Sequence, residues 1–201
     1  MKYRGILASV LMMAMLFGGC SADTATAKRI AEYYESLTAW KSNVAMTVDL
    51  GDRTADFRLA WDVTNGESCI TVLAPAEIAG LGIIVSADGQ TVTYEDAAIA
   101  LPCSDGTVAP MPTEALSAIH MFWKYGIRAA ETMEKDGEQM LVRVDYQSAD
   151  DTQKLSVTSW FDALALQPVR SEVFYDDVRV IACTFEDFVP QERHLQKKGN
   201  G

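Results

Sequence analysis

The sequence predicts a mainly β protein whose strands follow one another in an antiparallel meander. Residues 57–63 alternate apolar and polar side chains, as half-buried antiparallel strands do. Similar stretches flank Asn-Gly at 65–66 and Asp-Gly at 88–89 and 136–137, and these dipeptides favour tight hairpin turns. Only two segments have helical periodicity. Parallel strands joined by repeated crossover helices are therefore excluded.

These signals predict about ten or eleven strands. The final two are expected to be joined by a turn at Asp176-Asp177, because Asp favours turns. The predicted strands are 46–50, 57–63, 67–73, 83–86, 91–95, a short piece near 99, 131–135, 138–147, 153–161, 169–175 and 178–188.

Two helices accompany the strands. Residues 24–40 repeat apolar side chains at helical spacing, with charged residues on the other faces. The second helix follows two prolines, has Thr113 as its expected N-cap and ends at Gly126. Its apolar face consists of Leu116, Ile119, His120 and Trp123.

The N-terminus has the pattern of an export signal. Lys2 and Arg4 precede an apolar run of twelve residues, 6–17, whereas a membrane-spanning helix needs about 20. The sequence Gly-Gly-Cys at 18–20 follows and resembles the lipobox of bacterial lipoproteins, although Phe17 stands where that family usually has Leu. The resemblance implies a signal peptide at 1–19 and a diacylated Cys20. The alternative is a plain secretory signal that leaves Cys20 as a free thiol.

The charge of the mature chain argues against nucleic-acid partners. The chain of 201 residues has a net charge of −11, and removing residues 1–19 takes away two cations and no anion. The mature 182 residues therefore carry −13, which argues against a nucleic-acid-binding surface. We expect a lipidated tether at 20–26, one domain at 27–190 and a disordered polar tail at 191–201.

No residue pattern indicates an enzyme. His120 lies on an apolar helix face and His194 in the tail, so we interpret His120 as a core or groove residue. Cys69, Cys103 and Cys183 are an odd set without a Cys-x-x-Cys motif; we interpret them as thiols, although one disulfide pair is the alternative. We expect no metal and no cofactor.

Apolar residues of flexible or aromatic type are plentiful in the mature chain, which keeps all four tryptophans. Such side chains suit an adaptable apolar groove. They equally suit an ordinary core, and composition alone does not separate the two.

Two stretches carry a resemblance to a known family. The first is Ile-Thr-Val-Leu-Ala-Pro-Ala-Glu-Ile-Ala-Gly-Leu at 70–81, and the second includes Trp-Phe-Asp at 160–162 and the segment 174–188. They resemble the LolA/LolB-like lipoprotein-carrier superfamily, which includes LppX-like and RseB-like proteins. Within it they are closest to LolA-like and germination lipoproteins of Gram-positive clostridia. The resemblance covers about 27–190 and implies an unclosed antiparallel β half-barrel with both helices over its concave face.

Together with the lipobox-like N-terminus, the resemblance indicates a protein anchored by lipid to the outer face of the cell membrane. Such a protein would bind an acyl chain, lipid or lipoprotein in an apolar cavity, with segment 74–81 as a rim loop or lid. The alternative is a module that docks or regulates an envelope enzyme such as a germination-related cell-wall amidase. The candidate ligand-binding residues are Trp61, Ile70, Leu81, Ile83, Tyr94, Leu116, Ile119 and Trp123.

Overall fold

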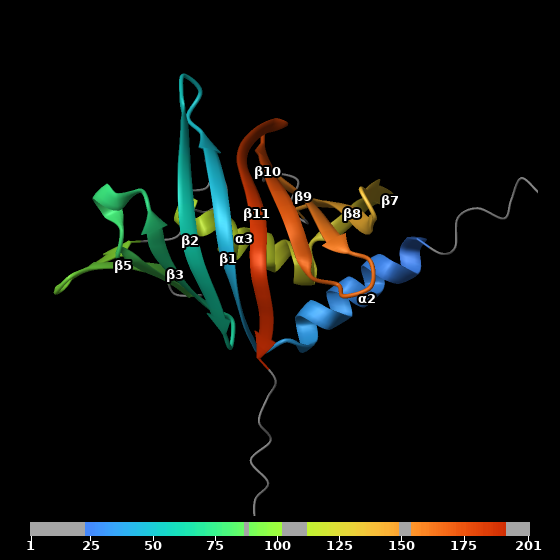
Figure 1. The fold of residues 1–201 in the computed structure, drawn as a ribbon, viewed down its shortest axis with the longest axis horizontal. Coiled ribbons are helices and arrows are strands. Elements are labelled where there is room, and N and C mark those ends of the chain that lie inside the picture. Colours follow the sequence, from blue (N-terminus) through green and yellow to red (C-terminus); the bar gives the residue numbers. More distant parts are fainter. Residues whose placement is uncertain (1–22, 87–88, 102–111, 149–153, 192–201) are drawn as a thin grey trace, which may run out of the picture.

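A computed structural model describes residues 23–86, 89–101, 112–148 and 154–191. These residues form one antiparallel sheet of eleven strands, two α-helices and a short 3-10 helix (Figure 1). The helices are α2 (Asp23–Ser36), η1 (Ala76–Ile78) and α3 (Pro112–Tyr125). The strands are β1 (Ala39–Asp49), β2 (Thr54–Thr64), β3 (Glu67–Ala74), β4 (Gly82–Ser86), β5 (Gly89–Tyr94), β6 (Ala97–Leu101), β7 (Ile127–Asp136), β8 (Gln139–Gln147), β9 (Leu155–Asp162), β10 (Pro168–Tyr175) and β11 (Val178–Gln191).

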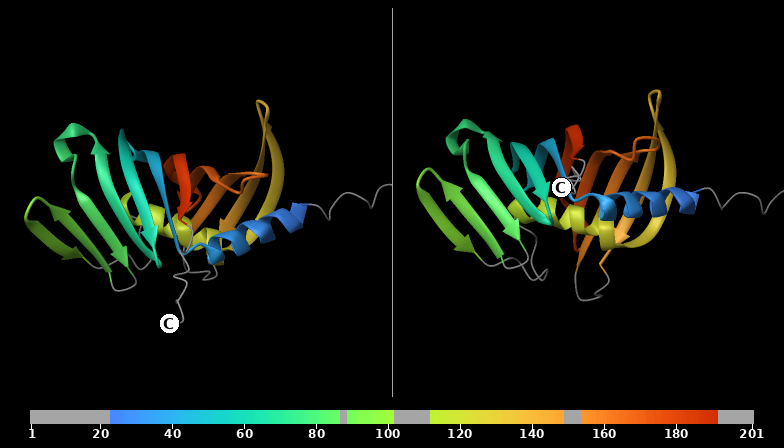
Figure 2. Two further views of the ribbon diagram at one scale, coloured as in Figure 1. Left: turned by 60° about the horizontal axis from the view of Figure 1, so that its bottom comes forward. Right: turned by 90° about the horizontal axis from the view of Figure 1, so that it is seen from below.

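The sheet is a meander that does not close. Its order is β6-β5-β4-β3-β2-β1-β11-β10-β9-β8-β7, so pairing of β1 with β11 joins the two halves of the chain. Strands β6 and β7 are the two free edges. The sheet curves, and α2 and α3 cross its concave side (Figure 2). The predicted half-barrel with two helices is confirmed.

The hairpin turns have the backbone conformation that their residues favour. Asn65 and Gly66 have φ of 53° and 88°, so both central residues are left-handed, as a type I′ turn requires. Asp176 and Asp177 have φ of 53° and 62°. They connect β10 to β11 as predicted.

Several predicted boundaries are wrong. The first helix ends at Ser36, and Trp40 lies in β1, which begins seven residues before the predicted strand at 46. The inward positions of early β1 are Trp40, Ser42 and Val44, and the polar Ser42 hides the alternation. In the second helix, Pro112 is the first residue rather than a residue before the cap, because its fixed φ and missing N–H suit the first helical position.

The core lies between the concave side of the sheet and the two helices. Trp40 and Trp61 pack edge to face with ring centroids 4.3 Å apart, and Tyr34 of α2 lies 4.8 Å from Trp123 of α3. Each of these side chains is fully buried. Aromatic pairs of this kind add about 0.5–1.5 kcal/mol beyond area burial. Three of the four tryptophans, Trp40, Trp61 and Trp123, therefore belong to the core.

The fourth tryptophan, Trp160, is not part of the core cluster. Its ring is covered by the side chains of Arg143 and Arg170. The Arg170 guanidinium carbon is 4.1 Å and that of Arg143 5.6 Å from the ring centroid. The indole N–H donates to Glu134 Oε2 at 2.8 Å. Cation–π contacts and a hydrogen bond thus cover the ring.

Candidate functional site

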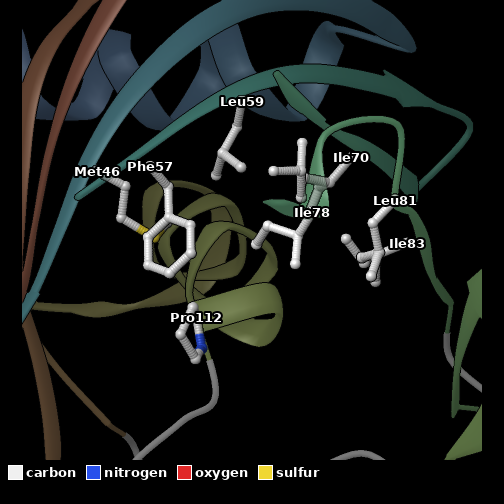
Figure 3. Close-up of a pocket in the computed structure, with 9 residues that line it drawn as sticks. Met46, Phe57, Leu59, Ile70, Ile78, Leu81, Ile83 and Pro112 are labelled. Atoms are coloured by element: carbon white, nitrogen blue, oxygen red, sulfur yellow. The ribbon is translucent and has the colours of Figure 1, made fainter. Parts of the chain in front are cut away.

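An apolar cavity of about 200 Å³ lies between β1–β4, η1 and the first residue of α3 (Figure 3). Every side chain that lines it is apolar. A dry cavity of about 150 Å³ is enough to bind benzene. The cavity therefore fits one apolar group, such as the end of a single acyl chain, and not several chains together. Its lining residues are Met46, Phe57, Leu59, Ile70, Val72, Ile78, Leu81, Ile83 and Pro112.

Strand register builds the wall of this cavity. Leu59 of β2 pairs with Val72 of β3, and Ile70 of β3 pairs with Ile83 of β4. Alternate side chains of a strand share one face, so each lining strand contributes inward residues to a continuous apolar surface. Neighbouring residues on the same strands point to the opposite, solvated face.

The segment 74–81 forms part of the wall. Ile78 and Leu81 line the cavity from this segment. It folds back on β3, because the Gly80 amide donates to Val72 O at 2.9 Å and the Val72 amide donates to Leu81 O at 2.9 Å. Gly80 has φ of +88°, a conformation that a residue with a Cβ rarely adopts. The backbone bonds hold the segment at the rim.

The predicted ligand-binding residues divide into three groups. Three line the cavity: Ile70, Leu81 and Ile83. Four are fully buried among the sheet and helices and do not line it: Trp61, Leu116, Ile119 and Trp123. Tyr94 is 46% exposed at the end of β5, while Cys20 and the signal peptide lie outside the described residues.

Sequence reasoning missed six lining residues. Phe57, Leu59 and Val72 lie on the same inward strand faces as the predicted residues, so extending each strand's alternation would have found them. Ile78 and Pro112 come from a bend and a helix start, which strand alternation does not mark, and Met46 comes from a strand that was predicted too short. The six are Met46, Phe57, Leu59, Val72, Ile78 and Pro112.

The core contains a buried chain of polar groups between α3 and strands β9 and β10, in the half of the sheet away from the cavity. The Trp123 indole N–H donates to Ser159 Oγ at 2.8 Å, and this oxygen is 2.7 Å from Ser171 Oγ. Ser159 and Ser171 are fully buried. The indole donor is therefore satisfied, as buried polar groups usually are.

His120 is buried and uncharged at neutral pH. Its ring packs edge-on against Trp40 at a centroid distance of 5.4 Å, and only 5% of the residue is exposed. Burial, with a smaller contribution from Lys124, lowers the pKa of His120 to about 4. Its Nε2 atom makes no hydrogen bond with the described residues. A catalytic imidazole is normally oriented by a partner, so this geometry favours a packing role.

The described cysteines are free thiols. Cys183 is buried opposite Met46 in the β1–β11 pairing, and burial raises its pKa. Burial and the neighbouring Glu67 carboxylate raise the pKa of Cys69. Cys103 lies outside the described residues. Low thiolate content makes Cys69 and Cys183 poor nucleophiles at neutral pH.

Among the residues that the structure describes, no three His, Cys, Asp or Glu side chains are grouped as metal ligands. In the same ranges, no helix has the length and apolarity needed to cross a bilayer.

No protein-family model matches the chain, and no curated protein sequence matches it. Solved structures do match its fold. An uncharacterized conserved protein from Thermus thermophilus has a TM-score of 0.50 at 9% identity, covering 84% of this chain and 88% of the other. A LolA superfamily protein from Nitrosomonas europaea has a TM-score of 0.44 at 14% identity, covering 83% and 94%.

One chain in the structure of the CwlD amidase from Clostridioides difficile in complex with the GerS lipoprotein gives a TM-score of 0.41 at 12% identity, covering 85% of this chain and 97% of the matched chain. At sequence identities this low, structural similarity is evidence about the fold and not about function. The architecture that the sequence resemblance implied, an unclosed antiparallel sheet with two helices over its concave side, is the one that the described residues form.

Proposed function

We propose that this chain is an extracytoplasmic lipoprotein whose cavity binds a single acyl chain. The observation that carries the proposal is the cavity of about 200 Å³ with only apolar lining side chains. Burial of acyl chain contributes about 0.8 kcal/mol per methylene group. About five to ten buried methylenes would contribute about 4–8 kcal/mol, which corresponds to reversible binding in the millimolar to micromolar range.

The anchor is the second part of this proposal. α2 begins at Asp23, within the segment expected to be a tether, so only two residues separate Cys20 from the folded body. The backbone amide of Ala27 donates to Glu131 Oε1 at 2.9 Å, which fastens the start of α2 to β7. A lipidated Cys20 would therefore hold the β7 end of the sheet at the membrane.

Labelling with radioactive palmitate tests the anchor. We expect label in the wild type and none in the Cys20→Ala variant. An unlabelled wild-type protein would show that Cys20 is not acylated, without affecting the cavity.

Displacement of an uncharged dye tests the cavity. We expect Nile red to bind the mature protein and 1-monolauroylglycerol to displace it. Leu81→Trp fills the rim and should weaken dye binding at least about tenfold. Leu155→Trp is the matched control, because Leu155 is also half-buried but lies on β9 in the other half of the sheet. Equal binding by both variants would refute the cavity as the site.

A second candidate is docking to an envelope protein, favoured by the free edge strand β6. All five of its residues are exposed and none is charged, and an uncharged edge can pair with another strand. A pull-down from envelope extract with Ile99→Lys as the comparison tests this role. A stoichiometric partner that the variant loses would support it, and an identical capture by both proteins would count against it.

A further inference from the structure

The stretch of chain that supplies most of the cavity contains no Lys or Arg. Between Arg58 and Lys124 the sequence has no Lys or Arg, but it has eight Asp and Glu residues. This stretch contains β3–β6, η1 and most of α3. It supplies seven of the nine cavity-lining residues. His120, within the same stretch, is uncharged at neutral pH because burial lowers its pKa to about 4.

The cations that border this stretch do not line the cavity. Arg58 alternates with the lining residues Phe57 and Leu59, so it points to the opposite face of β2, where its guanidinium lies 3.2 Å from Glu186 Oε2. Lys124 is near the C-terminal end of α3, over the Tyr125 ring at 5.3 Å.

Carboxylates, in contrast, lie beside the lining residues. Glu77 is exposed and precedes Ile78 in η1. Glu114 is 7% exposed, two residues after Pro112, and accepts a hydrogen bond from Gln90 Nε2 at 3.3 Å. An anionic group at the cavity would therefore lie near these two carboxylates.

The apolar wall continues from the cavity to the free edge of the sheet. Ile70 pairs with Ile83, Ile83 with Val92, and Val92 with Ile99. Exposure rises along this row from 2% at Ile70 to 60% at Ile99. Three strand spacings of about 4.8 Å make the row about 14 Å long. A chain with its end in the cavity can lie along the row and leave its head group at the β6 edge.

The exposed end of the row is acidic as well. Glu95 and Asp96 form the turn between β5 and β6, and both are exposed. A head group at this edge would therefore lie in a negative field.

We propose that the site selects single-chain amphiphiles whose head group carries no negative charge. This inference rests on the proposed acyl-binding function and adds its head-group specificity. A carboxylate or phosphate head would be repelled by the acids at the rim and edge, and within the described ranges no Lys or Arg lines the cavity to neutralise it. A neutral head meets no such repulsion, and a cationic head is attracted.

Three probes with the same twelve-carbon chain length test the selectivity: dodecanoate, 1-monolauroylglycerol and dodecyltrimethylammonium. Each competes with Nile red for the mature protein at pH 7.5 in low salt, below its critical micelle concentration. We expect the neutral and cationic probes to bind at least about tenfold more tightly than dodecanoate. The ratio should shrink in 0.5 M NaCl, because salt screens exposed charges.

Charge reversal assigns the selectivity to these acids. The double variant Glu77→Lys/Glu95→Lys should bind dodecanoate several-fold more tightly than the wild type. The control Glu35→Lys/Glu138→Lys makes the same change in net charge at two exposed positions on α2 and the β7–β8 turn. We expect it to keep the wild-type ratio.

The outcomes separate the two proposals. Tight binding of all three probes, or an unchanged ratio in the Glu77→Lys/Glu95→Lys variant, overturns the head-group selectivity and leaves the acyl-binding cavity standing. Failure of Nile red and all three probes to bind overturns the proposed function, and the selectivity with it.

Discussion

Acidification should destabilise this protein through His120, before most carboxylates are protonated. The imidazole is surrounded by Trp40, Trp61 and Trp123, with ring centroids 5.4, 6.4 and 6.4 Å away. Its pKa is about 4 in the folded protein and about 6.5 in an unfolded chain. Between these values the unfolded state binds more protons, so the free energy of unfolding falls as pH falls.

The size of this effect follows from the difference between the two pKa values. Each pKa unit corresponds to about 1.36 kcal/mol, so a depression to about 4 predicts a loss of about 3 kcal/mol between pH 7 and pH 4. Such a loss is a large part of the stability of an ordinary domain, which is about 5–15 kcal/mol.

Urea unfolding followed by tryptophan fluorescence at pH 7, 6, 5 and 4.5 measures the effect. His120→Phe keeps an aromatic ring in the site and loses no hydrogen bond at Nε2, because that atom has no partner among the described residues. We expect this variant to lose most of the pH dependence in this window. Carboxylates that titrate there act equally in both proteins and cancel in the comparison.

His194→Gln removes the only other histidine of the chain and serves as the control. It should follow the wild-type pH profile. If His120→Phe and the wild type lose the same free energy between pH 7 and pH 4.5, the burial argument for His120 is refuted.

Three further outcomes are expected. Ser159→Ala should lower the free energy of unfolding by about 1–3 kcal/mol, because it leaves the buried indole N–H of Trp123 without its acceptor; Ser156→Ala, on the half-buried opposite face of β9, is the control, and equal losses would contradict this reasoning. Cys183 should resist alkylation in the folded protein because it is buried and its pKa is raised, while the half-buried Cys69 should react faster. Peptide mapping after alkylation with and without urea checks this, and rapid alkylation of Cys183 in the folded protein would contradict it. Leu116→Ala, in the closed core, should lose more stability than Leu59→Ala, on the cavity wall, within the range of about 2–5 kcal/mol for such truncations; the reverse order in urea unfolding would argue that the cavity is closed by side chains in solution.

The fold was predictable because the turn dipeptides and the two-residue alternation of apolar side chains in the strands are both local sequence signals. Each of the eleven predicted strands overlaps a strand of the structure. Asn65 and Gly66 both adopt positive φ, which few residue pairs do readily, so this dipeptide places a hairpin and thereby the register of two strands. Within each half of the sheet, neighbours in sequence are neighbours in the sheet, so local signals are enough to order the strands there. The pairing of β1 with β11, which joins the halves and leaves β6 and β7 at opposite edges, is not local.

Local signals fail where one inward side chain breaks the pattern. Ser42 occupies an inward position of β1, and its hydroxyl donates to Glu186 O at 2.8 Å across to β11. That partner is 144 residues away in sequence. A polar residue satisfied by so distant a strand looks like the end of an alternating pattern, and the start of β1 was missed for this reason.

The cavity was less predictable than the fold because core and cavity share one sequence pattern. Trp61, Ile70, Ile83, Val92 and Ile99 lie in one cross-strand row on the same face of the sheet. Trp61 is fully buried in the core, Ile70 and Ile83 line the cavity, and Ile99 is 60% exposed at the free edge. All five are ordinary strand residues, and alternation predicts only that they face inward. Their different environments depend on which helix or rim segment covers each position. That coverage is a tertiary property, so a sequence can show which face is apolar without showing where that face is left open to a ligand.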